Sequence, residues 1–246
     1  LGFSVDLPPR LVGKLQKLGL IEEIARREHD RELTASLKKT AVPKSKDVLI
    51  EKYDAALDSR RDPESCTLIL TEGDSAKAFV VAGLSVIGRS KYGIFPLRGV
   101  PLNVSNLPMK RILENKEIAN IFKILNAAPD SCKGIRYGSV AICSDQDSDG
   151  SHICGLLLNL FVQCFPQLLK EKPHFVRRIV TPLIRATSRR RQEVRSFYSM
   201  QEFKMWERGA EVRDWSFKYY KGLGTSSSKE AREIFSTLDE HQITLS

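Results

Sequence analysis

The chain has 246 residues, of which 41% are hydrophobic and 28% are charged, a composition typical of a soluble globular protein. Its formal net charge of +9 favours a polyanionic partner. No apolar run is long enough to span a membrane, and the N-terminus lacks a signal-peptide pattern. The five cysteines are scattered and form no CxxC pair, which argues for a reducing compartment and against a zinc site.

The first 65 residues predict a helical connector. Leucine and isoleucine recur at helical spacing at positions 11, 15, 18, 21 and 24, so we expect amphipathic helices up to about residue 40. Residues 41–65 contain Pro43 and Pro63 among many charged residues and are interpreted as a linker. This segment shows no chemistry of its own.

A strand followed directly by a helix is predicted next. The sequence TLILT at 67–71 is a short apolar strand, and AFVVAGL at 78–84 has a helical pattern. Gly73 suits the tight turn between them, and Asp74 or Ser75 can cap the helix. Glu72 then stands at the end of the strand. For this motif alone, an ordinary acidic helix cap is favoured over a functional site.

A third strand is expected at 92–99, where it ends in a basic turn, and a charged helix at 109–125. The apolar residues of this helix that should face inward are Ile112, Ile118, Ile121 and Leu125. Because strands alternate with helices, we predict a parallel α/β sheet with right-handed crossovers.

Three carboxylates stand where a buried strand at 137–143 gives way to a helix that begins near residue 150. These are Asp145, Asp147 and Asp149, at the carboxyl edge where open α/β sheets bind ligands. Asp145 and Asp147 point the same way if the chain is extended. At about 4 Å their charges repel by about 4 kcal/mol at an effective dielectric of about 20. A hard cation such as Mg²⁺ would relieve this repulsion, and Mn²⁺ can usually substitute.

The acidic stretch has two other interpretations. A capped helix start, with Asp149 or Ser151 as the N-cap residue, is as plausible as a metal site from this stretch alone. An EF-hand calcium loop is excluded, because its twelfth position is Leu156 rather than Glu and a strand leads into it.

The most basic region lies within and just after a strand predicted at 175–187. It contains Arg177, Arg178, Arg185, Arg189, Arg190, Arg191 and Arg195. A phosphate-contacting face and a solvated hairpin both remain open there. Further on, a strand runs into the glycine-rich turn KGLGTS at 221–226, after which Ser228 can cap a final helix. This turn is neither a Walker A loop nor a GxGxxG fingerprint.

Four phrases in this order resemble the Toprim domain of type II DNA topoisomerases: EGDSA at 72–76, PLRG at 96–99, DxDxDGSH at 145–152 and YYKGLGTS at 219–226. The phrases YGxFPLRG at 92–99, LNV at 102–104 and IVTP at 179–182 resemble the eukaryotic branch rather than bacterial gyrase. The resemblance covers about residues 66–240. It implies a Rossmann-like α/β sheet flanked by helices, with a Toprim core at 66–190, a C-terminal extension at 191–246 and the end of the transducer segment at 1–65.

In that family, a tyrosine of another domain attacks a DNA phosphodiester, and a second duplex passes through the break, driven by ATP bound elsewhere. The resemblance implies that Glu72 and Asp145 hold one Mg²⁺ and that Asp145 and Asp147 hold a second. Asp149 would support them through water or hydrogen bonds. The candidates for contacts to DNA phosphates are Lys77, Arg98, His152 and Lys221.

The chain departs from the family pattern at Val100 and Cys154, where relatives usually carry lysine. No segment resembles the ATPase or the winged-helix region, so no nucleophilic tyrosine is expected here. Tyr53, Tyr92, Tyr137, Tyr198, Tyr219 and Tyr220 are interpreted mostly as core residues. We therefore expect a fragment that is inactive by itself. Full-length relatives are homodimers that act on double-stranded DNA, for example in DNA replication. The expected location is the nucleus, or cytoplasmic replication sites for a cytoplasmic DNA virus.

Two alternatives to a topoisomerase stay open. Primases and nucleases of the Toprim group also carry one Glu and a DxD, although the YKGLGT phrase argues against them. A non-catalytic DNA-binding module would use the acidic cluster only as a helix cap and would bind DNA without metal dependence.

Overall fold

The structure is a computed structural model that describes residues 50–127, 134–209 and 212–245. The helices expected before residue 40, and Cys132, lie outside these residues. The other four cysteines are buried and unpaired. Within the described ranges, no helix combines the length and apolar character needed to cross a membrane.

The main sheet has five strands in the order β2-β1-β3-β4-β8. Their bounds are β1 Thr67–Thr71, β2 Tyr92–Pro96, β3 Ser139–Cys143, β4 Val176–Ile179 and β8 Gln242–Thr244. The first four strands pair in parallel, as predicted, whereas β8 pairs antiparallel with β4. The sheet is therefore mixed at one edge, which differs from the purely parallel sheet expected.

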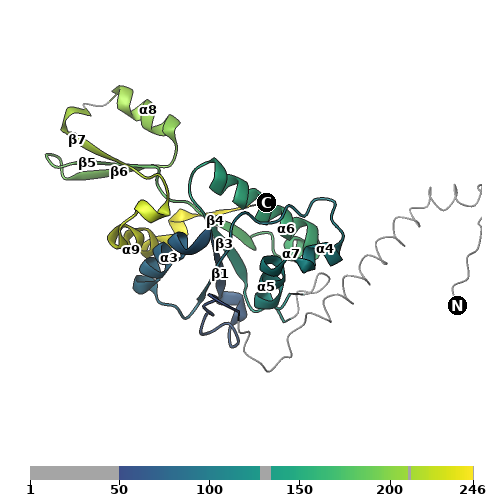
Figure 1. Cartoon of the computed structure of the whole chain (residues 1–246). Helices are drawn as coiled ribbons and strands as arrows, with labels where there is room; N and C mark the ends of the chain where they lie inside the picture. Colours follow the sequence, from purple (N-terminus) through teal and green to yellow (C-terminus); the bar gives the residue numbers. More distant parts are fainter. Residues whose placement is uncertain (1–49, 128–133, 210–211, 246) are drawn as a thin grey trace, which may run out of the picture.

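Helices cover both faces of this sheet (Figure 1). Helices α3 (Gly73–Ile87) and α9 (Ser228–Ser236) pack on one face through Phe79, Leu84 and Phe235. The other face carries α4 (Met109–Glu114), α5 (Lys116–Leu125), α6 (Ser148–Cys164) and α7 (Pro166–Glu171). All five residues of β3 are buried, since both of its faces are covered. The central strands and their carboxyl ends are thus fixed by two apolar cores.

The single helix expected at 109–125 is two helices, because Asn115 is extended between them. The Asn115 side chain accepts a hydrogen bond from the Ile118 amide and so caps α5. The four residues expected to face inward are all buried, so the apolar pattern predicts the buried face correctly but does not predict the break at Asn115.

The strand expected at 175–187 is also divided. Its halves are β4 and β5 (Ile184–Ser188), which lie in different sheets on either side of Pro182. Proline has no amide hydrogen and cannot continue a sheet ladder. Strand β5 is the centre of a second, antiparallel sheet with β6 (Glu193–Phe197) and β7 (Trp215–Tyr219).

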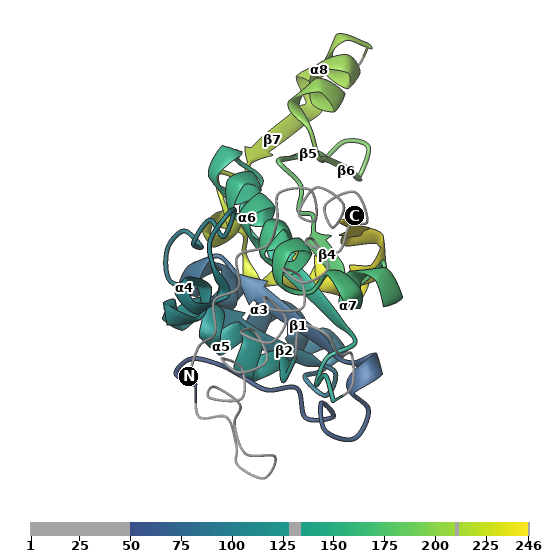
Figure 2. The same cartoon turned by 90° about the vertical axis from the view of Figure 1, so that its right-hand side faces the viewer.

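The second sheet, with α8 (Met200–Gly209) against it, extends away from the main sheet (Figures 1 and 2). Its small core is largely aromatic and includes Phe197, Phe203 and Trp215. Four 3-10 turns complete the described elements: η1 Pro63–Ser65, η2 Val212–Asp214, η3 Leu223–Thr225 and η4 Leu238–His241.

Residues 50–62 run along the edge of the main sheet, and we call this segment the strap. Asp54 of the strap forms a bridge with Ile94 of β2, and the Tyr53 and Tyr137 hydroxyls are 2.6 Å apart. Tyr137 is fully buried, as expected for a core tyrosine. Two tyrosines are exceptions: Tyr198, directly after β6, is 38% exposed and Tyr219 of β7 is 53% exposed.

Candidate functional site

Glu72 and Asp145 follow two adjacent strands, β1 and β3, whose last residues Thr71 and Cys143 are paired. The Glu72 amide donates to the Cys143 carbonyl at 3.1 Å, which continues the pairing by one residue. The Asp145 amide in turn donates to Oε2 of Glu72 at 3.2 Å. The parallel sheet therefore brings together two carboxylates that are 73 positions apart in the sequence.

Asp147 is the N-cap residue of α6, because its Oδ1 accepts the Gly150 amide at 2.8 Å. The prediction of a capped helix start is thus confirmed, but the cap is neither Asp149 nor Ser151. Asp149 is exposed in the first turn. The loop before the helix is tight: a Cβ at position 150 would lie 2.1 Å from the Asp145 carbonyl oxygen. Only glycine fits there, and its close approach keeps the loop from Asp145 through Asp147 to Gly150 compact.

The glycine-rich turn, residues 221–226, closes onto Asp145. The Leu223 amide donates to Oδ1 of Asp145 at 2.8 Å. A Cβ on Gly222 would lie 2.4 Å from Oδ2 of the same carboxylate, so the missing side chain lets the backbone approach. We call residues 221–226 the glycine loop. Sequence reasoning noted the cation of Lys221 in this loop but missed the backbone contact to Asp145.

The carboxylates repel one another in the absence of a cation. Burial raises the pKa of Glu72, and the negative charges of Asp145, Asp147 and Asp149 raise it further. The hydrogen bond from the Asp145 amide opposes this shift in pKa. The electrostatics therefore favour binding of a positive ion beside Glu72.

The donor atoms fit a hard cation that retains part of its water. Within the described ranges, no three Asp, Glu, His or Cys side chains are arranged to hold a metal ion between them. The structure instead brings together the pair Glu72 and Asp145, and Asp147 follows two residues after Asp145. Mg²⁺ is commonly bound by one or two carboxylates and completed by waters and substrate phosphates. The carboxylate set fits such an ion.

Arg178 of β4 is a site residue that sequence reasoning assigned only to a general basic face. Its Nη2 donates to the Asp145 carbonyl at 3.1 Å, and its Nη1 donates to Oγ of Ser151 at 3.5 Å. The arginine therefore holds both ends of the acidic loop. Arg178 pairs with Ile142 of β3 and so lies beside the acidic loop that follows β3, a pairing that the sequence alone does not reveal.

The four predicted phosphate-binding cations fall into two groups. Lys77 pairs with Asp54 at 2.8 Å and Arg98 pairs with Glu51 at 2.7 Å, so both are held by carboxylates of the strap. His152 and Lys221 are exposed. His152 lies on α6, the helix that Asp147 caps. Lys221 lies on the glycine loop, whose Leu223 amide contacts Asp145.

The basic stretch after β4 is partly paired within the chain. Arg185 binds Glu233 at 2.7 Å and Arg190 binds Asp214 at 3.1 Å. Arg195 lies over the rings of Trp206 and Trp215. These three arginines already have partners within the chain, and the choice between a phosphate-contacting face and a solvated hairpin stays a prediction.

The two departures from the family pattern have different surroundings. Val100, at a position where the resemblance leads us to expect lysine, is 64% exposed two residues after Arg98. Cys154 is 5% exposed and belongs to the core under α6, so a small thiol is accommodated there.

Comparison with known proteins agrees with this geometry. A family model described as the Toprim domain matches residues 67–181, and a model described as the C-terminal associated domain of TOPRIM matches residues 179–246. DNA topoisomerase 2 of Pisum sativum is 44% identical over an alignment of 248 positions that covers 98% of this chain and 17% of that protein. DNA topoisomerase 2 of Bombyx mori is 42% identical over an alignment of 254 positions that covers 98% of this chain and 16% of that protein.

The fold is similar to a solved structure of the Plasmodium falciparum topoisomerase II DNA-binding, cleavage and re-ligation domain. The TM-score is 0.75 at 43% identity, and the match covers 81% of this chain and 28% of that one. The two family models match one after the other along the chain. The chain therefore carries a Toprim domain followed by its associated C-terminal domain. It corresponds to the Toprim region of eukaryotic-type DNA topoisomerase 2 and spans about one sixth of the length of these relatives.

Proposed function

We propose that this chain is the Mg²⁺-binding, DNA-cleavage and religation portion of an ATP-dependent type II DNA topoisomerase. The observation that carries the proposal is the pair Glu72 and Asp145 on adjacent strands, with the glycine loop closed over Asp145. The relatives named DNA topoisomerase 2 and the solved cleavage domain support the same function. They do not favour a Toprim primase or nuclease, or a non-catalytic DNA-binding module.

In this proposal Glu72 and Asp145 hold the metal nearest the scissile phosphate, and Asp145 with Asp147 holds a second. Bound Mg²⁺ supplies positive charge to the phosphate oxygens during transfer. Asp149 is exposed in the first turn of α6, where it can support the ions through water. Lys221 of the glycine loop and His152 of α6 are exposed and can contact DNA phosphates.

Lys77 and Arg98 are each paired with an acidic residue of the strap. These pairs are partly exposed, so exchange of a carboxylate for a DNA phosphate costs little. We propose that both cations reach phosphate when DNA is bound.

The remaining parts of the reaction are assigned outside this chain. The proposal places the nucleophilic tyrosine and the ATP site in other domains, and the working protein as a homodimer on double-stranded DNA. The isolated chain is then inactive. The proposed location is the nucleus for a cellular protein, or cytoplasmic replication sites for a cytoplasmic DNA virus.

The experiment is decatenation of interlinked DNA circles with ATP and Mg²⁺ by the protein that carries this chain, wild type beside Asp145→Asn. Asparagine keeps an oxygen that can accept the Leu223 amide but removes the charge that binds metal. We expect unlinking to fall by about 100-fold or more. Asp239→Asn, in the 3-10 turn η4, is the matched control and should unlink as the wild type does.

Other outcomes distinguish the alternatives. Metal-dependent nicking or primer synthesis by the wild type, without unlinking, would indicate a Toprim nuclease or primase. Salt-dependent DNA binding without any metal-dependent chemistry would indicate a DNA-binding module. Unlinking that Asp145→Asn leaves intact would contradict the assignment of the metal site.

A further inference from the structure

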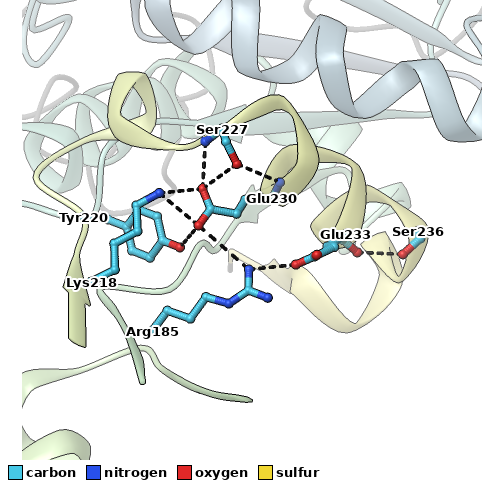
Figure 3. Close-up of polar contacts among 7 residues, drawn as sticks. All are labelled: Arg185, Lys218, Tyr220, Ser227, Glu230, Glu233 and Ser236. Carbon is cyan, nitrogen blue, oxygen red and sulfur yellow. Dashed lines mark hydrogen bonds and ion pairs between the residues drawn. The ribbon is translucent and has the colours of Figure 1, made fainter. Parts of the chain in front are cut away.

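Glu230 of α9 is the centre of a hydrogen-bonded cluster next to the glycine loop (Figure 3). Its carboxylate accepts hydrogen bonds from Nζ of Lys218, at 2.7 and 2.9 Å, and from the hydroxyl of Tyr220. It also accepts the amide of Ser227 at 2.7 Å and the hydroxyl of Ser227 at 2.9 Å. The Glu230 side chain is 12% exposed, so these charge-assisted bonds are largely shielded from solvent.

The partners of Glu230 stand on both sides of the glycine loop in the sequence. Lys218 and Tyr220 precede residue 221, and Ser227 follows residue 226. One carboxylate therefore fixes both ends of the loop whose middle touches Asp145. We call Glu230 with Lys218, Tyr220 and Ser227 the clasp.

The loop needs such a constraint to hold Asp145. It contains Gly222 and Gly224, and glycine backbones lose more conformational entropy on ordering than other residues do. The contact that matters is a single backbone hydrogen bond, from Leu223 to Oδ1 of Asp145. If the ends of the loop were free, that amide would no longer be presented in a fixed direction.

We propose that Glu230 is a positioning residue for the metal-binding carboxylate Asp145, acting through the two ends of the glycine loop. The inference rests on the proposed function, because it concerns how the metal ligand of that function is oriented. Glu230 itself touches neither Glu72 nor Asp145 in the hydrogen bonds of the described residues, so its effect must pass through the loop.

The chain offers a matched control on the same helix. Glu233, one turn after Glu230, binds Arg185 of β5 at 2.7 Å and has no hydrogen bond to residues 218–227 among those described. Arg185 also lies 3.9 Å from Glu230, so both glutamates link α9 to the second sheet. Substitution of Glu233 therefore removes a carboxylate between α9 and the second sheet but keeps the hydrogen bonds that hold the two ends of the glycine loop.

The experiment compares Glu230→Gln, Tyr220→Phe and Glu233→Gln in the protein that carries this chain. Three quantities are measured: the Mg²⁺ concentration for half-maximal DNA cleavage, the Kd for the same DNA, and hydrogen exchange of a peptide spanning residues 221–226. For Glu230→Gln we expect the Mg²⁺ midpoint to rise by about 10-fold or more and the loop amides to exchange faster, with Kd within twofold. Tyr220→Phe should shift both quantities in the same direction by less.

Glu233→Gln should leave the Mg²⁺ midpoint and loop exchange unchanged. A folded Glu230→Gln protein with a wild-type midpoint and wild-type loop exchange would overturn the inference while leaving the proposed function intact. If Glu230→Gln does not fold, the Tyr220→Phe result decides by the same criterion. A wild type without metal-dependent cleavage would remove the proposed function and this inference with it.

Discussion

Asp145 is contacted by three parts of the chain that lie far apart in the sequence. Its amide binds Glu72 at the end of β1, its carbonyl binds Arg178 of β4, and its Oδ1 binds Leu223 of the glycine loop. These bonds fix the backbone and one carboxylate oxygen, so little reorganisation is needed when a cation binds. The orientation of the Asp145 side chain should therefore be sensitive to substitutions at the residues that contact it.

Gly222→Ala should damage the site without unfolding the protein. The added Cβ would lie 2.4 Å from Oδ2 of Asp145, so the carboxylate must move, whereas the backbone at residue 222 is extended and tolerates alanine. We expect the free energy of unfolding to change by less than about 1 kcal/mol and metal-dependent cleavage to fall by about 100-fold. Chemical denaturation and a cleavage assay measure the two effects.

Gly224→Ala is the control in the same loop. Its Cβ would meet its nearest neighbour, Cβ of Ser75, at an ordinary contact distance of 3.6 Å. Equal losses of cleavage in both variants would mean that glycine flexibility, rather than the approach to Asp145, is what the loop requires.

Glu230 should make stability depend on pH in the acidic range. Burial alone would raise its pKa, but hydrogen bonds from Lys218, Tyr220 and Ser227 outweigh this and lower the pKa from 4.5 to about 2. A carboxyl with a depressed pKa in the folded state stabilises the fold above its unfolded pKa and loses that contribution as pH falls towards the folded value. We expect wild type to lose about 1–3 kcal/mol more than Glu230→Gln between pH 5 and pH 2, measured by urea denaturation. Parallel pH curves for the two proteins would contradict the assigned pKa.

At the scale of the helices, Asp147 combines a cap with a proposed metal contact. Asp147→Ala removes the acceptor for the Gly150 amide and should destabilise the protein by about 1 kcal/mol. Asp147→Asn keeps a capping oxygen and should be nearly neutral in stability. If Asp147 also contacts metal, both variants lose metal-dependent cleavage. Cleavage that survives in Asp147→Asn would leave Asp147 as a cap alone.

The contact between α3 and α9 depends on the absence of a side chain at Gly83. A Cβ there would lie 2.2–2.7 Å from three atoms of the Phe235 ring, which is buried and cannot move aside. Gly83→Ala should therefore cost about 1–3 kcal/mol through overpacking. Gly155→Ala in α6 meets no atom within 4 Å and should instead stabilise by about 0.5–1 kcal/mol, since alanine favours a helix. Thermal melts of the two variants that shift in the same direction would contradict this account.

The strands that precede Glu72 and Asp145 could be predicted from the sequence, because β1 and β3 are apolar, rich in β-branched residues and followed by glycine-containing turns. The breaks within the predicted helix at 109–125 and the predicted strand at 175–187 were harder to predict. Asn115 was hidden within a continuous apolar pattern, and Pro182 was treated as part of one strand although proline interrupts a ladder. The Leu223 contact could not be predicted, since a backbone amide has no residue signature and Asp145 is 78 positions away.

At the scale of the whole molecule, the net charge of +9 predicted a polyanionic partner but not where that partner binds. Many basic side chains are paired within the chain, including Lys77, Arg98 and Arg185. The carboxyl edge of the main sheet, by contrast, gathers carboxylates that repel one another. A metal ion between this edge and DNA phosphate would reconcile an acidic site with an acidic ligand.

Mn²⁺ binding to the protein that carries this chain, in the presence of a short DNA duplex, tests the central claim most directly. Free Mn²⁺ can be counted by electron paramagnetic resonance for wild type, Glu72→Gln, Asp145→Asn and the control Asp239→Asn. We predict saturable binding to wild type and to Asp239→Asn, with an affinity at least about 10-fold lower in the other two variants. Equal Mn²⁺ binding by all four proteins would show that Glu72 and Asp145 do not hold the metal.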